Sequence, residues 1–150
     1  MGANVIASQW GKTPRESVLD ECRRLGTRNV VAQCVGILDG GEIDEVTLLA
    51  LAGPAAEGVL QGREGGLDGY WPRVWAMRGF LYAWNATAVP VVLNGARDDH
   101  WRVREMSAKV VARHQVVEAV AAMEDLKDDP TPRVRTAADR ALARLFDFGA

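Results

Sequence analysis

The stretch DDHWRVREMSAKVVARH at 98–114 brings together residue types that could do chemistry: a tryptophan, both histidines of the chain and four basic residues. His100 directly follows Asp98 and Asp99, and an imidazole beside carboxylates can act as a general acid or base. His114 lies fourteen residues further along. On a helix this separation is roughly 21 Å, so the two histidines cannot share a metal ion. Polar residues at a helix start usually form a cap, and we expect that role here in place of catalysis.

Neither a nucleophile nor a metal site accompanies this stretch. No Ser-His-Asp, Cys-His or HExxH arrangement is visible, and Cys22 and Cys34 are twelve residues apart, outside any metal-ligand spacing. The glycine-rich QGREGGLDG at 61–69 is not followed by Gly-Lys-Ser/Thr, so it does not read as a phosphate-binding loop. We therefore expect no catalytic residue, no cofactor, no metal and no enzyme activity.

Composition indicates an ordinary globular protein. The chain has 150 residues, 48% of them hydrophobic, and 18 basic against 20 acidic residues. This is the size of one domain, which we expect at 13–150 after a flexible tail at 1–12. There is no secretory signal and no run of eighteen apolar residues. Together with the two cysteines, read as free thiols, this predicts a cytoplasmic protein without a membrane partner.

A repeated segment organises the C-terminal two thirds of the chain. Three copies superimpose without gaps on an Arg-Val pair: WPRVWAMRGFL at 71–81, HWRVREMSAKVV at 100–111 and TPRVRTAADRAL at 131–142. Each copy follows another apolar segment, and these lie at 53–62, 86–98 and 116–129. The unit is therefore two short helices and a turn. We predict repeats at 53–84, 86–114 and 115–146.

The apolar positions of each copy have helical spacing. In the third copy they fall on one helix face: Val134, Ala137, Ala138, Ala141, Leu142 and Leu145. No segment alternates long enough to predict a strand, so the chain is predicted to be all-α. Residues 14–50 read as further helices separated by glycine-bearing breaks, with Pro14 and Glu16 at a helix start and Gly26 at a stop. They form either worn repeats or an N-terminal helical cap.

The pattern Asp-x-x-x-x-Val-Arg, at Asp98 to Arg104 and again at Asp129 to Arg135, resembles the second helix of a HEAT repeat. The resemblance implies a short α-α solenoid, a superhelix of helix pairs, with the second helices lining one surface. It also implies a structural ladder in which Arg104 and Arg135 pair with the capping aspartates of the next repeat. The first copy departs from the pattern, because Gly69 and Trp75 replace the Asp and the Arg.

Positions opposite the apolar stripe of the second helices should share the inner surface. In the second and third copies most are basic: Arg102, Lys109, Arg113, Arg133, Arg140 and Arg144. The outer segment 115–129 is acidic, so the charge is predicted to be polarised. In the first copy, Arg73 is followed at equivalent positions by Phe80 and Trp84. Either the N-terminal helices cover these aromatic rings, or an aromatic patch lies beside the basic one.

These features predict a small binding or scaffold module that recognises a protein or peptide, possibly an acidic one, on a basic surface. The candidate binding residues are Arg73, Arg102, Lys109, Arg113, Arg133, Arg140, Arg144, Phe80, Trp84 and Trp101. The alternative for each arginine is a purely structural role, solvated or paired with a cap. Trp101 and Trp71, both near turns, would then seal the join between repeats.

Two other functions stay open, both drawn from the resemblance. Some HEAT-like proteins are alkylpurine DNA glycosylases that hold duplex DNA on a basic concave face. This chain is similar to them in having Trp71, Trp75, Trp101, Asp98, Asp99 and Arg104. Its length and near-neutral charge argue against a nucleic-acid partner. HEAT-like subunits of bilin lyases are the third possibility, although no residue here identifies a chromophore pocket.

Overall fold

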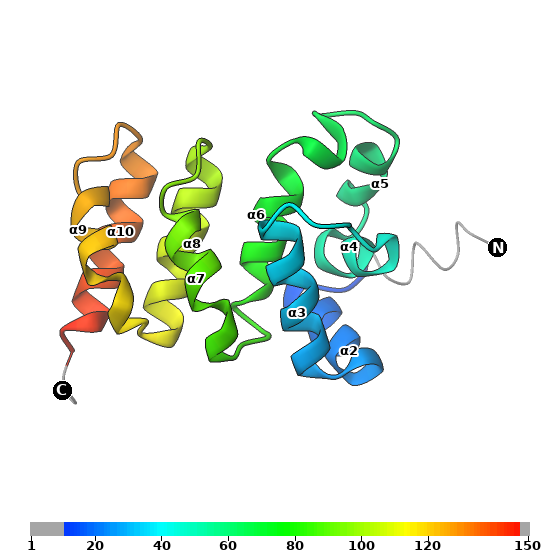
Figure 1. Ribbon diagram of the computed structural model, residues 1–150, viewed down its shortest axis with the longest axis horizontal. Coiled ribbons are helices and arrows are strands. Elements are labelled where there is room, and N and C mark those ends of the chain that lie inside the picture. The colour runs from blue at the N-terminus through cyan, green and yellow to red at the C-terminus, as the bar shows by residue number, and fades with distance from the viewer. Residues whose placement is uncertain (1–10, 148–150) are drawn as a thin grey trace. The chain divides into compact units, whose positions relative to one another are not determined.

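The computed structural model describes residues 11–147, which contain nine α-helices, three 3-10 turns and no strand (Figure 1). The all-α prediction is confirmed. Of the tail expected at 1–12, residues 1–10 lie outside the described residues. None of the helices between 11 and 147 has both the length and the apolar character that crossing a membrane requires.

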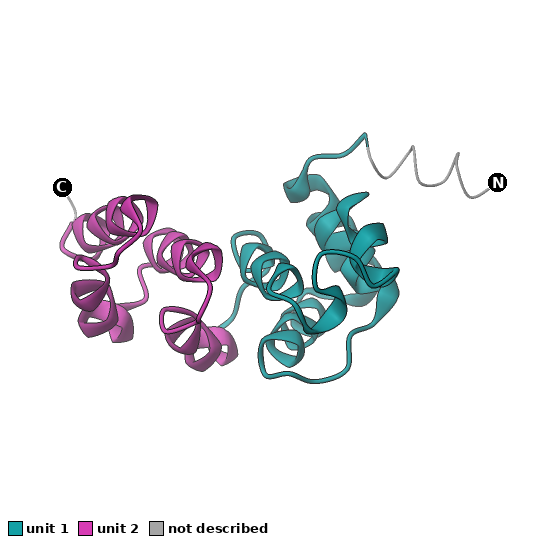
Figure 2. Cartoon of the chain, turned by 90° about the horizontal axis from the view of Figure 1, so that it is seen from above, with its two compact units in different colours: residues 1–85 teal, residues 86–150 magenta. Residues whose placement is uncertain are grey.

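The chain divides into two compact units, with the boundary between Asn85 and Ala86 (Figure 2). The sequence predicts one domain over 13–150, and within the described residues the tertiary contacts cluster on either side of this boundary. The first predicted repeat falls in unit 1, and the second and third fall in unit 2.

Unit 1 begins with two helices that local sequence defines well. Helix α2 (Pro14–Leu25) starts in a capping box, in which the Thr13 hydroxyl accepts from the backbone N–H of Glu16 and the Glu16 carboxylate accepts from that of Thr13. It ends at Gly26, whose φ of 88° suits glycine. Helix α3 (Thr27–Leu38) follows at once. The predicted start near Pro14 and stop at Gly26 are confirmed.

The remaining helices of unit 1 are α4 (Glu45–Ala52), the short α5 (Ala55–Leu60) and α6 (Trp71–Gly79). Helix α6 packs mainly against α3 and α4, whereas α5 contacts α4 and the 3-10 turn at Gly66–Asp68. Helix α6 approaches α3 and α4 closely at Gly79, where an added Cβ would lie 2.9 Å from Leu51 Cδ2 and 3.1 Å from Cys34 Sγ.

The predicted pairing of segment 53–62 with segment 71–81 is therefore corrected. Helix α4 takes the place expected for α5, because α5 has only six residues and a glycine-rich connection separates it from α6. A hydrogen bond supports the new pairing. Arg78 Nη2 of α6 donates to the Leu51 carbonyl of α4 at 2.8 Å, and in unit 2 the Ser107 hydroxyl donates to the Val92 carbonyl at 2.7 Å.

Unit 2 consists of two helix pairs. The first joins α7 (Val89–Gly95) to α8 (Trp101–His114), and the second joins α9 (Val120–Leu126) to α10 (Pro132–Leu145). A 3-10 turn precedes α7 and another precedes α9. Helices α8 and α10 pack extensively against each other, so the second helices of the two repeats lie side by side (Figure 1).

The core of unit 2 is the apolar stripe that the periodicity predicts. The six stripe positions of α10 are all buried, and so are Val103, Val110 and Val111 of α8. Burying each such side chain contributes roughly 1.5–3 kcal/mol for Val and Leu. The opposite faces of α8 and α10 are left to form a surface.

Candidate functional site

A groove runs between the second helices of unit 2. It has a volume of about 410 Å³ and lies between α8 and α10. Its lining residues are Glu105, Lys109, Ala112, Pro132, Arg133, Thr136, Ala137 and Arg140. We call it the α8–α10 groove. Three of these residues are cations and one is a carboxylate, so the groove carries a surplus of positive charge.

Glu105 organises the cations of the groove. Its side chain is only 10% exposed, and its Oε2 accepts from Arg133 Nε at 2.9 Å. The Lys109 Nζ atom lies 3.8 Å from the same oxygen. Within the described part of the chain, the guanidinium of Arg140 has no hydrogen bond or ion pair. Arg140 therefore presents the surplus charge of the groove.

An aromatic ring adjoins the groove through Arg133. The Cζ atom of Arg133 lies 5.5 Å from the centroid of the Trp101 ring, and that of Arg102 lies 4.5 Å from it. At these distances the indole face attracts both cations. The His100 ring stacks near Trp101, with centroids 6.0 Å apart. Arg133 is thus held between an indole and a carboxylate.

His100 caps a helix in this structure. Its Nδ1 accepts from the backbone N–H of Arg102 at 3.2 Å, at the start of α8. Its own backbone N–H donates to the Asp98 carboxylate at 2.9 Å. The imidazole and the Asp98 carboxylate therefore cap the backbone at the start of α8, which is the role predicted for polar residues at a helix start.

The structure brings five of the predicted binding residues together around the α8–α10 groove. They are Trp101, Arg102, Lys109, Arg133 and Arg140. Arg113 and Arg144 are exposed in the last turns of α8 and α10, and Gln115 Nε2 donates to the backbone carbonyl of Arg144.

The residues of the proposed ladder lie between the two repeats of unit 2. Arg104 pairs with Asp129 at 2.8 Å and also donates to the backbone carbonyls of Asp98 and Asp99. Arg135 donates to the backbone carbonyl of Asp129 at 2.7 Å. Arg104 therefore pairs with a residue of the next repeat, whereas Arg135 bonds within its own repeat.

The remaining predicted residues belong to unit 1. Phe80 is fully buried, so its inclusion among the binding residues is corrected: a core side chain contacts no partner. Trp84 is half-buried and meets the Phe80 ring edge-on, with centroids 5.9 Å apart. Arg73 is half-buried and donates to the Gly69 carbonyl at 3.1 Å.

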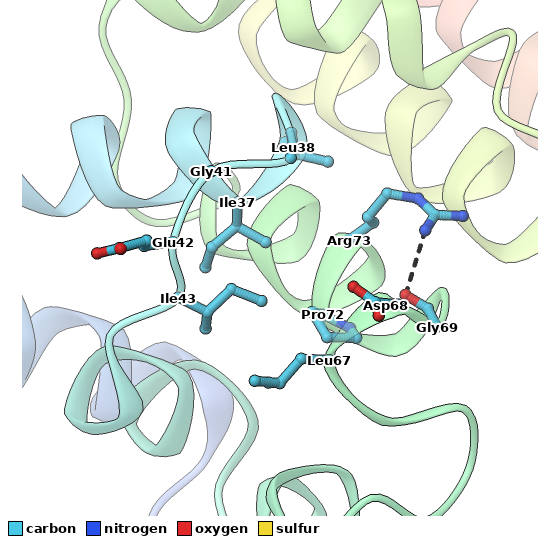
Figure 3. A pocket seen from close by; sticks show the side chains of 11 residues that line it. Ile37, Leu38, Gly41, Glu42, Ile43, Leu67, Asp68, Gly69, Pro72 and Arg73 are labelled. Carbon is cyan, nitrogen blue, oxygen red and sulfur yellow. Dashed lines mark hydrogen bonds between the residues drawn. The ribbon is translucent and has the colours of Figure 1, made fainter.

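Arg73 also lines a cavity that sequence reasoning missed. The cavity has a volume of about 480 Å³ and lies between the end of α3, the turn that follows it and the start of α6. In Figure 3, Ile37, Ile43, Leu67 and Pro72 surround the hollow, whereas the Glu42 carboxylate points away. The only sequence signals are the glycines at 40, 41 and 69, which mark turns without showing that they line one cavity.

Metal-binding chemistry has no visible basis in the described residues. Between 11 and 147, no three His, Cys, Asp or Glu side chains gather closely enough to hold a metal ion. Cys34 is buried, and desolvation raises the pKa of its thiol to about 12, with a smaller contribution from Cys22.

Comparison with known proteins bears on the same helices. A family model described as HEAT repeats matches residues 71–143, from the first residue of α6 into α10. This range contains all three Arg-Val pairs on which the copies superimpose. Comparisons with curated proteins and with solved structures gave no match. The sequence repeat, the helix pairs of unit 2 and the family match agree that residues 71–143 of this chain are HEAT repeats.

Proposed function

We propose that this chain is a binding module that holds an acidic segment of a partner protein in the α8–α10 groove. HEAT repeats generally mediate protein interactions or scaffolding. The observation that carries the proposal is the arrangement of Lys109, Arg133 and Arg140 around one groove that has a single carboxylate among its lining residues. Such a surplus of cations favours an acidic partner.

The size and chemistry of the groove fit a peptide. A volume of about 410 Å³ lies within the range of small-ligand sites, enough for a few side chains. Ala112, Pro132 and Ala137 supply apolar walls between the cations. A segment that alternates acidic and apolar side chains would therefore pair its charges with the cations and bury its apolar groups.

Trp101 and Glu105 support the proposal by holding Arg133 in place. An arginine side chain that is already ordered loses less conformational entropy when it binds a ligand. Arg133 is tethered to Glu105 at 2.9 Å and lies over the Trp101 ring. We propose that it orients the acidic segment, while Arg140 provides the charge that has no partner within the described residues.

The proposed function is binding without catalysis, in the cytoplasm. The His100 imidazole, which stacks near Trp101, caps α8. Cys22 and Cys34 are free thiols, which fits a reducing compartment. A nucleic-acid partner is the alternative, and the experiment below separates it from a peptide.

The test is fluorescence anisotropy with a labelled peptide of alternating Glu and Leu. We expect a Kd of about 10 µM, which corresponds to about −7 kcal/mol. Arg140→Glu should weaken binding at least about tenfold, because it removes the net positive charge of the groove. Lys127→Glu makes the same charge change just after α9, where Lys127 lies half-exposed beside Glu124, and should leave the affinity unchanged.

Two comparisons complete the test. A peptide of alternating Gln and Leu should not bind, since it lacks the carboxylates. Equal weakening by Arg140→Glu and Lys127→Glu would show a general charge effect and contradict a groove site. A DNA duplex that binds more tightly than the acidic peptide, with an affinity that falls steeply with salt, would favour the nucleic-acid alternative.

A further inference from the structure

Arg78 occupies a position that is a core position in the other two repeats. The superposition on the Arg-Val pairs aligns it with Ser107 and Ala138. Both of those side chains are fully buried. In unit 1 the same position of α6 carries a guanidinium, which is half-buried. A charged group at such a position needs a partner or loses much of its hydration free energy.

The contacts of Arg78 leave its charge without a carboxylate. Its Nη2 donates to the Leu51 carbonyl at 2.8 Å, and no ion pair to Arg78 occurs among the described residues. Residues 1–10 and 148–150 contain no Asp or Glu. Desolvation lowers the pKa of Arg78, and the neighbouring Tyr82 opposes this only in part. The protein therefore buries part of this cation without supplying an acidic side chain for it.

Arg78 lines a small cavity in unit 1 with a volume of about 140 Å³. The other lining residues are Lys12, Thr13, Pro14, Ser17, Ala50, Leu51, Ala52, Gly53 and Pro54. Two of the lining residues are cations and none is acidic. We call this space the Arg78 cavity.

The charges and hydroxyls around the Arg78 cavity define what it can take. Lys12 is already paired with Asp20 at 2.5 Å, so Arg78 contributes the one uncompensated charge. The Ser17 hydroxyl donates to the Ala50 carbonyl at 2.6 Å, which leaves the guanidinium as the main donor. A planar guanidinium matches a carboxylate with two parallel hydrogen bonds, and the alanine and proline walls suit a short aliphatic chain.

We propose that the Arg78 cavity binds the carboxylate of a short aliphatic acid. The guanidinium pairs with the carboxylate, and the hydrocarbon part lies against Ala50, Ala52 and Pro54. The same chemistry is offered by a free small acid and by a glutamate side chain of another chain. This site lies in unit 1 and is independent of the function proposed for the α8–α10 groove in unit 2.

The test is a titration with propionate, followed by backbone amide NMR at constant ionic strength. Saturable shifts are expected for residues 12–17 and 50–53, with half-saturation in the millimolar range. At a propionate concentration ten times the Kd, the unfolding equilibrium constant should fall about tenfold. Propionamide has the same shape without the charge and should cause no saturable shift.

Arg78→Ser is the decisive variant. The second repeat has a serine, Ser107, at this position, and its hydroxyl donates to the Val92 carbonyl of the paired helix. Arg78→Ser should therefore fold. It should lose the propionate response in both measurements. Arg28→Ser removes an exposed arginine of α3 and should keep the response. The same shifts in Arg78→Ser, or saturation by phosphate but not by propionate, would overturn the proposal.

A second ligand identifies the source of the carboxylate. N-acetyl-glutamate amide presents a glutamate side chain as it occurs in a protein. Binding that is tighter than that of propionate supports a protein carboxylate as the natural occupant, and weaker binding supports a free acid. If neither ligand causes saturable shifts, the cavity binds no carboxylate and the proposal is wrong.

Discussion

Arg104 and Asp129 form a two-pronged ion pair between the repeats of unit 2. Arg104 Nε donates to Asp129 Oδ2 at 2.8 Å, and Nη2 donates to Oδ1 at 3.3 Å. The side chains are only 15% and 5% exposed. The Asp129 carboxylate also accepts from the backbone N–H of Thr131 at the start of α10. One carboxylate therefore links α8 to the first turn of α10.

Removing Arg104 should destabilise the protein strongly. Arg104→Met leaves the Asp129 carboxylate buried without its cation, and breaking such a pair costs about 3–5 kcal/mol. Urea denaturation followed by circular dichroism measures the change. The control is Lys127→Met, which breaks a half-exposed pair to Glu124 and should cost less than about 1 kcal/mol. Similar losses in the two variants would contradict a buried role for the pair.

Two glycine substitutions should change stability in opposite directions. Gly36 lies inside α3, and a Cβ added there meets nothing within 4 Å. Gly36→Ala should therefore stabilise the protein by about 0.5–1 kcal/mol. Gly79→Ala places its Cβ 2.9 Å from Leu51 Cδ2 and 3.1 Å from Cys34 Sγ, both in the core. It should destabilise by about 1 kcal/mol through overpacking.

Thermal denaturation of the two alanine variants checks this difference. A higher melting temperature for Gly79→Ala than for wild type would mean that Leu51 and Cys34 move aside at no cost. The close approach of α6 to α3 and α4 would then tolerate a side chain.

Cys34 should resist alkylation as long as the protein is folded. Its thiol is buried, and burial raises its pKa to about 12, so almost no thiolate forms at pH 8. A Cys22→Ser variant leaves Cys34 as the only thiol. Iodoacetamide at pH 8, followed by mass spectrometry, should modify this variant in urea but not in buffer. Rapid modification in buffer would place the thiol at the surface.

The same thiol makes stability depend on pH. The unfolded thiol has a pKa of about 8.5, below the folded value. Its contribution is therefore fully present below about pH 8.5 and is lost as the pH rises toward 12. Over pH 9–11, wild type should lose about 1.4 kcal/mol per pH unit more than Cys34→Ala. Parallel pH profiles would contradict the burial of the thiol.

Glu105→Gln tests the charge balance of the α8–α10 groove. The amide oxygen can still accept from Arg133, but the groove loses its only carboxylate. The affinity for the acidic peptide should rise about fivefold, at a cost in stability of about 1 kcal/mol. Anisotropy and urea denaturation measure the two effects. An unchanged affinity would show that Glu105 does not compete with the ligand for the cations.

Most helices of the fold could be predicted because their signals are local. The Pro14 start, the Gly26 stop and the stripe of α10 depend on neighbouring residues and on helical periodicity. The partner of α6 could not be predicted in this way, because pairing is a tertiary property. In hindsight, EVTLLALA of α4 is apolar on every side, which is typical of a helix packed from several directions.

Residues of the candidate site could be predicted only where the two repeats carry them at equivalent positions of their second helices. Lys109, Arg133 and Arg140 reach one groove because α8 and α10 lie side by side with equivalent faces. The role of Glu105 depends on which atoms of α10 approach it, and no spacing along α8 contains that information. For the same reason, the sequence left open whether Phe80 is covered or exposed, and the structure places it in the core.

The ion pair between Arg104 and Asp129 joins residues 25 positions apart in the sequence. The other side-chain bonds between the two repeats, from Arg133 to Glu105 and from Gln115 to Arg144, join residues 28 and 29 positions apart. The entropy lost in closing such short loops is modest, and folding rates rise as contacting residues lie closer in the chain. Unit 2 should therefore fold rapidly, because its contacts join residues that lie close in the sequence. One helix pair can form and template its neighbour, and the second pair can dock before any distant part of the chain is in place.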